Sequence, residues 1–489
     1  MARYDYDVII LGGGIAGFSA AGMAAGLGKT VLLVEKGRLG GNCSLRTCIP
    51  TKALIRAGEA YGNLGAASEF GLECQLPAID TTRVNKYVRR VIEEVGAIDN
   101  PESFKQMGID IEFGAPSFVD RHRIKLGSRV ISGNKFIIAT GSSPARLNVE
   151  GAAETPYFTT ENIFSEDKLP ASIIILGGGP AGIEYATAYC ALGLKVTVVE
   201  LADTILARED KEMTRLVAER LRQNGVTLLT GWQTVRLFRT GEEVSAEIKS
   251  ASGETMVLTA EALLMTIGRV PNLEGLSLEK AGVAVTPRGI KTDLGMRTTA
   301  DNIYAAGDVV GPFQTGAVAE YQALIAANNA LIPVVKKRAD YRTILWITYT
   351  SPPLAHVGLT EEEARKRYGD KVKIYHYEYS RMRRARVDRQ DFGVAKFITD
   401  AAGKPLGIHI LGLHAEEMAH EAELLRVYRK PLHTLHFVNH AYPTYSEAIF
   451  KRMGDISYLD RMAANPIIRL GLELMPGFVN NLEKLKKKL

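Results

Sequence analysis

The chain has 489 residues, of which 46% are hydrophobic and 24% charged, and it carries a formal net charge of +5. This length exceeds one hydrophobic core and predicts several domains, while the mildly basic balance fits a solvated surface and gives no reason to expect a nucleic-acid partner. No apolar run reaches the ~18 residues of a membrane span, the start MARYDYD does not resemble a signal peptide, and the four cysteines are too few for a secreted disulfide scaffold, so we expect a cytoplasmic protein.

The segment from Tyr6 to Lys36 predicts a strand, a glycine turn, a helix and a second strand. Gly12, Gly14 and Gly17 have the spacing G-x-G-x-x-G, and Glu35 follows 18 residues after the last glycine. Such glycines permit a tight turn, a close approach of pyrophosphate to the backbone and close packing of helix on strand, and the acid can accept hydrogen bonds from a ribose. This segment therefore predicts a dinucleotide site.

The same pattern recurs at residues 172–200, with glycines at Gly177, Gly179 and Gly182 and an acid at Glu200. A carboxylate at this position suits the free 2′-hydroxyl of NAD and repels the 2′-phosphate of NADP. Two dinucleotide sites in one chain indicate a flavoprotein that receives electrons from a nicotinamide.

Further patterns divide the chain into domains. Strand-and-turn segments at 135–144 and 263–272 predict the exits from the two nucleotide-binding domains. From about Ile344, strand-like runs and the acid-rich helical stretch HAEEMAHEAELLRVY predict a separate α+β domain. The expected domains are 1–149 (first dinucleotide), 150–272 (second dinucleotide), 273–343 (return to the first domain), 344–460 (a separate domain) and 461–489 (a basic amphipathic extension).

Two of the four cysteines lie in GGNCSLRTCIPTKAL, residues 40–54. Three interpretations of this pair are open: a structural disulfide, a metal site, or two thiols that take part in chemistry. A cytoplasmic setting argues against the disulfide, and no second Cys/His pair has zinc-site spacing, so we predict no metal site here. A helical turn brings Cys43 and Cys48 within disulfide distance, and Pro50 suits the first turn of a helix. At that helix N-terminus the dipole lowers the pKa of Cys48.

Taken together, the motifs resemble the class I flavoprotein pyridine nucleotide-disulfide oxidoreductases, which include dihydrolipoamide dehydrogenase, glutathione reductase and mercuric reductase. The likeness runs from Tyr6 to about Met453 and rests on GGGIAG…E, GGNCSLRTCIPTK, ATG, GGGPAGIE…E, GRVPN, AAGDV, HVGLTEEEA and YPTYSE. It implies an α/β chain with two Rossmann-like domains, the first for FAD and the second for NAD(H), with NADP(H) less favoured. It also implies a C-terminal α+β dimerisation domain and a homodimer with shared active sites.

The resemblance assigns roles to residues. Cys48 faces the flavin, Cys43 exchanges with a small-molecule disulfide or carrier-bound dithiol, and Lys52 pairs with Glu184 near the flavin and nicotinamide. The positions expected to contact the cofactors are Gly12, Gly14, Ile15, Ala16, Gly17, Glu35, Lys36, Gly41, Asn42, Lys52, Gly114, Ala115, Ala139, Thr140, Gly141, Gly177, Gly179, Pro180, Ala181, Gly182, Glu184, Glu200, Gly268, Arg269, Gly307 and Asp308.

The C-terminal motif departs from the pattern of the lipoamide and glutathione enzymes, which carry a histidine before Pro-Thr. Here that position is Tyr442, while the acid that orients the base is retained as Glu447 and another histidine lies at His440. A histidine titrates near about 6.5 and accepts a thiol proton, whereas a tyrosine near about 10 mostly donates. Dihydrolipoamide oxidation should therefore suffer unless His440 replaces the base or the pKa of Tyr442 is strongly perturbed. The tyrosine can still donate a hydrogen bond to a leaving thiolate or hold a bound ion or thiolate. The other interpretation is that Tyr442 only packs at an interface.

This tyrosine places the chain nearest the mercuric-reductase-like branch, although it lacks the C-terminal cysteine pair of those enzymes. The main prediction is a dihydrolipoamide dehydrogenase-like, FAD-dependent NADH:disulfide oxidoreductase. One alternative is a mercuric-reductase-like metal-ion or quinone reductase that uses NAD(P)H and the flavin directly, with the thiols as an optional relay. A non-enzymatic alternative is a flavin-bearing redox sensor or scaffold. The arginines in Arg381–Arg389 form either a solvated or interface stripe, or a docking patch for an acidic carrier domain or an anionic substrate. The extension 461–489 either packs on the dimer or makes peripheral membrane contact.

Overall fold

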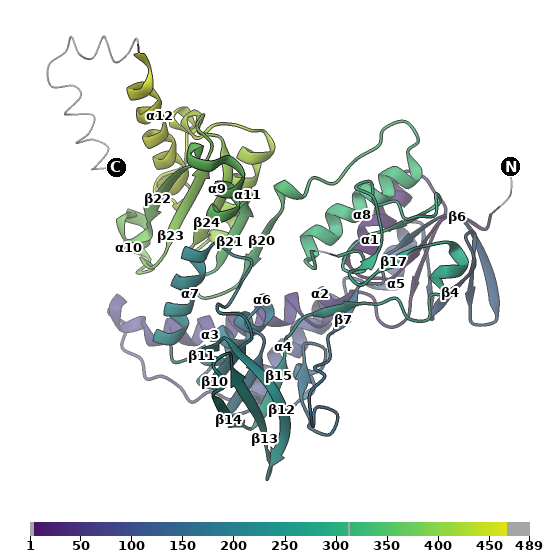
Figure 1. Cartoon of the computed structure of the whole chain (residues 1–489), viewed down its shortest axis with the longest axis horizontal. Helices are drawn as coiled ribbons and strands as arrows, with labels where there is room; N and C mark the ends of the chain where they lie inside the picture. Colours follow the sequence, from purple (N-terminus) through teal and green to yellow (C-terminus); the bar gives the residue numbers. More distant parts are fainter. Residues whose placement is uncertain (1–3, 312, 467–489) are drawn as a thin grey trace. The chain divides into compact units, whose positions relative to one another are not determined.

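The computed structural model describes residues 4–311 and 313–466 and divides into two compact units (Figure 1). The first unit comprises Met1–Leu206 and Ala218–Asp340, and the second Ala207–Val217 and Tyr341–Leu489. Helix α7 (Lys211–Gln223) contains the second division point. Within the described part of the chain, no helix has the length and apolar character needed to cross a membrane.

A seven-stranded sheet organises the N-terminal part of the first unit, in the order β3-β2-β1-β6-β5-β4, with β19 beside β6. Strands β1, β2, β3, β6 and β19 run parallel. Helical crossovers connect β1 to β2 and β2 to β3, whereas β3 reaches β6 through the strands β4 and β5. The apolar runs of β1 and β2 are buried, as expected for strands covered on both faces. The bounds are β1 Tyr6–Leu11, β2 Val31–Glu35, β3 Ile109–Phe113, β4 Pro116–Asp120, β5 Arg123–Leu126, β6 Arg129–Ile138 and β19 Ile303–Ala305.

The helices around this sheet include two that are built largely from small residues, α1 and α8, which lie beside each other (Figure 1). Alanine and glycine allow these helices to approach closely, so residues 15–26 and 316–331 meet although they are far apart in sequence. The bounds are α1 Ile15–Gly26, α2 Gly41–Leu45, α3 Cys48–Gly65, α4 Thr81–Gly96, α5 Pro101–Gln106 and α8 Gly316–Leu331.

A second parallel sheet in the same unit has the order β11-β10-β9-β15-β8, and α6 (Pro180–Ala191) connects β9 to β10. An antiparallel sheet of β12, β13 and β14 follows, and short pairs join β7 to β16 and β17 to β18. The bounds are β7 Ser142–Pro144, β8 Phe158–Thr159, β9 Ser172–Leu176, β10 Lys195–Glu200, β11 Thr227–Thr230, β12 Trp232–Thr240, β13 Glu243–Ser250, β14 Thr255–Ala260, β15 Ala262–Met265, β16 Arg269–Pro271, β17 Val285–Thr286 and β18 Gly289–Ile290.

The second unit is built on an antiparallel five-stranded sheet of order β20-β21-β24-β23-β22. Its core includes Phe397, Ile408, Ile410 and Phe450, which are fully buried. The bounds are β20 Leu345–Thr348, β21 Leu354–Gly358, α9 Glu361–Tyr368, β22 Lys373–Glu378, α10 Arg383–Val387, β23 Val394–Thr399, β24 Pro405–Leu411, α11 Ala415–Val427 and α12 Arg452–Ala464.

This architecture confirms the predicted fold class: two Rossmann-like sheets in the first unit and a separate α+β unit at the C-terminus. One difference lies at Ala207–Val217, which groups with the second unit although it falls inside the expected second nucleotide domain. Most of the predicted C-terminal extension, from residue 467 onward, lies outside the described residues.

Candidate active site

The first glycine turn joins β1 to α1. Gly12 has a φ of +114° and lies against the backbone of Ala139, so a side chain there would collide with main-chain atoms. A Cβ at Gly17 would lie only 1.8 Å from the carbonyl oxygen of Gly12, closer than the 2.3 Å between a Cβ at Gly12 and the carbonyl oxygen of Ala139. At Gly14, in contrast, a Cβ would find its nearest neighbour 3.7 Å away, and no side chain caps the helix that follows. The turn therefore leaves space and backbone N–H groups for a phosphate.

The expected FAD-site residues gather at one edge of the first sheet, because parallel strands all end there. Gly114–Ala115 follow β3, Ala139–Gly141 follow β6, and Gly307–Asp308 follow β19. At the end of β2, Glu35 accepts hydrogen bonds from Gly13 N and Gly37 N, both at 2.7 Å, and Lys36 follows it. The carboxylate is thereby fixed beside the glycine turn, where a ribose would lie.

Ser142 links several of these residues, and the sequence did not single it out. Its hydroxyl donates to Asp308 Oδ2 at 2.6 Å and accepts from Arg269 Nε at 2.7 Å, while its carbonyl accepts from Asn42 Nδ2 at 2.8 Å. Burial raises the pKa of Asp308. The network brings together three expected cofactor residues that lie as much as 266 positions apart in the chain.

The second glycine turn repeats the first. Gly177 has a φ of +108° and lies against the backbone of Thr266, Gly182 faces the carbonyl of Gly177, and Gly179 has open space around its Cβ position. Pro180 and Ala181 begin α6. Glu200, at the end of β10, accepts from Gly178 N at 2.5 Å and from Ala202 N at 2.8 Å. Gly268 follows β15 with a φ of +128°.

Cys43 and Cys48 are free thiols with their Sγ atoms 2.9 Å apart. They do not share one helical turn as expected: Cys43 lies in α2 and Cys48 begins α3, because the chain leaves helical geometry at Arg46 and Thr47. The Cys43 hydrogen bond lowers the pKa of Cys48 to about 6, with help from the Lys52 charge, whereas the same hydrogen bond and burial raise the pKa of Cys43. These shifts favour Cys48 as the more acidic thiol of the pair.

Lys52 follows one turn later on α3. Its Nζ lies 2.7 Å from Glu184 Oε2, so the ion pair implied by the resemblance is present. Thr51 also donates to Glu184 Oε2, at 3.1 Å. The Glu184 side chain is only 8% exposed and comes from α6, so this contact connects the cysteine helix to the helix of the second glycine turn.

The tyrosine motif lies in the second unit. Tyr442 is 63% exposed, and its phenolic oxygen accepts from Arg383 Nη1 at 3.2 Å, which leaves the O–H free to donate elsewhere. Both residues line a small pocket of about 50 Å³, together with Arg381, Arg384 and Glu447. The arginine segment and the tyrosine motif therefore form one surface.

His440 is not paired with Glu447. Its Nε2 lies 3.0 Å from Glu421 Oε1 and its Nδ1 lies 3.2 Å from the carbonyl oxygen of Val438. Glu421 comes from α11 and also accepts the Ser446 hydroxyl, a partner that sequence spacing could not reveal. Glu447 begins a π-helical turn, Glu447–Lys451, and its backbone N–H donates to Thr444.

The arginines of the predicted docking patch are engaged locally. Arg384 donates to Asp388 at 2.7 Å, Arg386 donates to the carbonyl of Ser380, and Arg381 stacks over the Tyr377 ring. These contacts hold the segment in place around the pocket, and the docking of an acidic carrier stays a prediction.

Comparisons with known proteins agree over nearly the whole chain. Residues 6–323 match the pyridine nucleotide-disulphide oxidoreductase family, and residues 344–453 match the dimerisation domain of that family. A dihydrolipoyl dehydrogenase of Bacillus subtilis is 34% identical over 91% of this chain and 96% of its own length. A mercuric reductase of Staphylococcus aureus is 33% identical over 86% of this chain and 77% of its own length.

Solved structures of similar shape include the HOCl-induced flavoprotein disulfide reductase RclA from Escherichia coli, seen as a Cu(II) complex. That structure is 28% identical, covers 93% of this chain and 100% of its own, and has a TM-score of 0.83.

Proposed function

This chain belongs to the pyridine nucleotide-disulphide oxidoreductase family, and we propose that it works as an NADH-dependent reductase whose Cys43–Cys48 pair delivers electrons to a disulfide. Members of the family depend on FAD and use NAD(P)H. The two glycine turns fit these cofactors, since each leaves open space where a pyrophosphate would lie. Bound FAD would take a hydride from the nicotinamide and reduce the cysteine pair.

The observation that carries the proposal is the asymmetric thiol pair. The two Sγ atoms lie 2.9 Å apart, and the hydrogen bond between them lowers the pKa of Cys48 to about 6, which favours the thiolate at Cys48 and the protonated thiol at Cys43. As Cys43 Sγ attacks one sulfur of an acceptor disulfide, Cys48 takes the Cys43 proton, and the first acceptor thiolate leaves and receives that proton from Cys48. The Cys48 thiolate then attacks Cys43 Sγ and the second acceptor sulfur leaves as a thiolate. The cysteine pair is thereby oxidised by two electrons to a disulfide, and the acceptor disulfide is reduced.

The tyrosine at position 442 favours reduction of an acceptor over oxidation of dihydrolipoamide. Oxidation requires a base to take thiol protons, whereas Tyr442 keeps its O–H available to protonate a leaving thiolate. His440 is held between Glu421 and a backbone carbonyl, which supports a structural role for this histidine. A homodimer in which Tyr442 of one subunit serves the thiols of the other is part of the proposal.

A second candidate is the reduction of a metal ion, with quinones as further acceptors. It is favoured by Tyr442 together with the mercuric reductases among the relatives and the Cu(II) complex of RclA. In this alternative the flavin would reduce the metal ion or quinone directly, and the two thiols would serve as an optional relay.

An acceptor screen tests both candidates. The holoenzyme is assayed with NADH and NADPH against lipoamide, glutathione disulfide, other small disulfides, Hg(II), Cu(II) and quinones. The proposal requires disulfide reduction that Cys43→Ser abolishes, and a long-wavelength thiolate–flavin absorption band on anaerobic NADH titration that Cys48→Ser removes. Full disulfide activity in Cys48→Ser without that band would refute it, and rapid metal-ion reduction without disulfide reduction would select the second candidate.

A further inference from the structure

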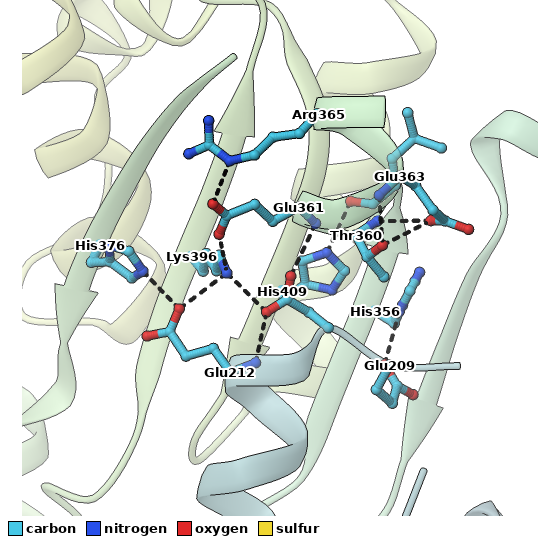
Figure 2. A network of polar contacts seen from close by, with 12 residues as sticks. Glu209, Glu212, His356, Thr360, Glu361, Glu363, Arg365, His376, Lys396 and His409 are labelled. Atoms are coloured by element: carbon cyan, nitrogen blue, oxygen red, sulfur yellow. Dashed lines mark hydrogen bonds and ion pairs between the residues drawn. The ribbon is translucent and has the colours of Figure 1, made fainter. Parts of the chain in front are cut away.

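A polar row crosses one face of the sheet in the second unit. The row has one residue from each of the five strands, and each residue is the direct cross-strand partner of the next. In order from β20 to β22 they are Trp346, His356, His409, Lys396 and His376. Glu209 contacts this row from the segment that precedes α7 (Figure 2). The next residue, Asp210, accepts a hydrogen bond from Lys396. His356, His409 and Lys396 are at most 2% exposed. Side chains of this kind are rarely so buried unless they are paired with other polar groups or coordinate a metal ion.

Both histidines are oriented by backbone carbonyls. His356 Nε2 lies 2.8 Å from Gly358 O, and His409 Nε2 lies 3.0 Å from Leu359 O. A carbonyl oxygen can only accept, so both Nε2 atoms carry hydrogen. For the neutral imidazoles, the lone pairs are then on Nδ1. An imidazole N–H donated to a backbone carbonyl is the usual support for a histidine that binds metal through its other nitrogen.

The Glu209 carboxylate and the Nδ1 atoms of His356 and His409 are three hydrogen-bond acceptors, and none of them can donate to another. Its Oε1 accepts from Trp346 Nε1 at 2.5 Å, and its Oε2 lies 2.8 Å from His356 Nδ1. His409 Nδ1 is buried and has no hydrogen-bond partner. A proton can bridge Glu209 and His356, but it leaves His409 Nδ1 unpaired, whereas a metal ion satisfies all three groups.

Charge and distance also fit a cation. Lys396 Nζ lies within 3.0 Å of a carboxylate oxygen of Asp210, Glu212 and Glu361. Arg365 pairs with Glu361 (Figure 2). With Glu209, the carboxylates of this network exceed its lysine and arginine by two charges. One potential ligand atom from each of Glu209, His356 and His409 lies within 4.8 Å of the others. Zinc bonds of about 2.0–2.1 Å place ligand atoms roughly 3.4 Å apart, so a small inward adjustment suffices.

We propose that Glu209, His356 and His409 bind a divalent transition-metal ion of the zinc type, as a buried structural site separate from the redox thiols. Two imidazole nitrogens and one carboxylate oxygen are ligands that Zn²⁺ accepts readily. The metal would link the segment at Ala207–Val217 to β21 and β24 of the second unit.

The test uses full-length holoenzyme carrying Cys43→Ser and Cys48→Ser, so that the redox thiols cannot capture metal. Elemental analysis after gel filtration should find about one zinc per chain. In a Trp232→Phe background, Trp346 is the remaining tryptophan, and it stacks on His356 with ring centroids 3.6 Å apart. Added Co²⁺ should therefore quench its fluorescence and saturate at about one equivalent.

Substitutions then locate the metal. His409→Gln should weaken metal binding by at least about 100-fold, because it removes a ligand. His440→Gln should not change it, because His440 contacts Glu421 and the carbonyl of Val438 and is not a member of the cluster. The proposal would be overturned if the protein held no zinc and the Trp346 fluorescence did not change on addition of Co²⁺ or Zn²⁺. A proton shared between Glu209 and His356 would then occupy the cluster. The proposal would also be overturned if His409→Gln and His356→Gln retained as much metal as the protein with the intact cluster. If these variants do not fold, the zinc content and Co²⁺ quenching of the protein with the intact cluster test the proposal.

Discussion

At Cys48, three local features combine to hold a thiolate: the position at the start of α3, the hydrogen bond from Cys43 and the charge of Lys52. The first was visible in the sequence, because Pro50 indicated a helix start. The other two required the fold, since Cys43 lies on a separate helix and Lys52 is oriented by Glu184 from α6. The reactivity of one sulfur therefore depends on contacts from three helices.

Removal of the Lys52 charge should raise the pKa of Cys48 by about 1, because a nearby cation favours the thiolate. With a pKa of about 6 in the unsubstituted enzyme, the thiolate disappears as the pH falls through that value. In Lys52→Met the long-wavelength thiolate–flavin band should vanish at a higher pH. Arg56→Met is the matched control, since Arg56 lies on the same helix and pairs with Glu59. Equal midpoints in Lys52→Met and the parent would contradict the assigned role.

Tyr442 should determine the direction of the reaction. Tyr442→His restores the base expected before Pro-Thr, and dihydrolipoamide oxidation should rise by roughly tenfold or more, since general bases contribute ~10²–10⁴-fold. Tyr442→Phe removes the proton donor and should slow disulfide reduction without improving oxidation. Steady-state rates in both directions check this. If neither substitution altered either rate, Tyr442 would serve only to pack at an interface.

Among the elements, the two glycine turns could be predicted in detail because their determinants lie within a few residues. Gly12, Gly17, Gly177 and Gly182 occupy positions where a side chain would strike backbone. The strands β1, β2, β9 and β10 were equally clear from their apolar runs. The pairings at Ser142 and Glu421 could not be predicted, because each joins loops or helices whose proximity depends on the folding of whole sheets.

Helix α1 offers a direct test of the close packing. In Gly17→Ala the new methyl group meets the carbonyl of Gly12, so the first sheet or the helix must shift, at a cost of about 1–3 kcal/mol. Less FAD should remain bound after dilution and gel filtration, and the melting temperature should fall. Gly22→Ala on the same helix meets no atom within 4 Å and should stabilise it by about 0.5–1 kcal/mol. Equal FAD retention by the two variants would exclude the proposed role of Gly17.

At the scale of the whole molecule, motif order predicted the succession of two nucleotide-binding regions and a C-terminal α+β unit. The cluster of Glu209, His356 and His409 could not be foreseen in the same way. The histidines face each other only because β21 and β24 pair in that register, and Glu209 comes from a segment that belongs to the second unit although it lies inside the nucleotide-binding half of the sequence. Residues that lie 53 and 200 positions apart need a folded sheet to become one site.

A shared active site predicts that two defective chains can complement each other. Cys43→Ser removes the nucleophile, and Tyr442→Ala removes the group expected from the partner subunit. The two chains are expressed together with different affinity tags, and the hybrid dimer is purified through both. If each site takes its thiols from one subunit and its tyrosine from the other, one of the two sites in the hybrid is intact.

The hybrid should therefore recover about half of the parent's disulfide reductase activity per dimer, provided that each variant homodimer is measured as defective with the same acceptor. If thiols and tyrosine came from one subunit, both sites of the hybrid would carry a defect and the activity would stay at the homodimer level. Loss of the recovered activity when Cys48→Ser is added to the Tyr442→Ala chain provides the control, because that chain must supply the working thiols. If the hybrid were no more active than the variant homodimers, Tyr442 would lie outside the active site of the partner. The preferred direction of the reaction would then need another explanation.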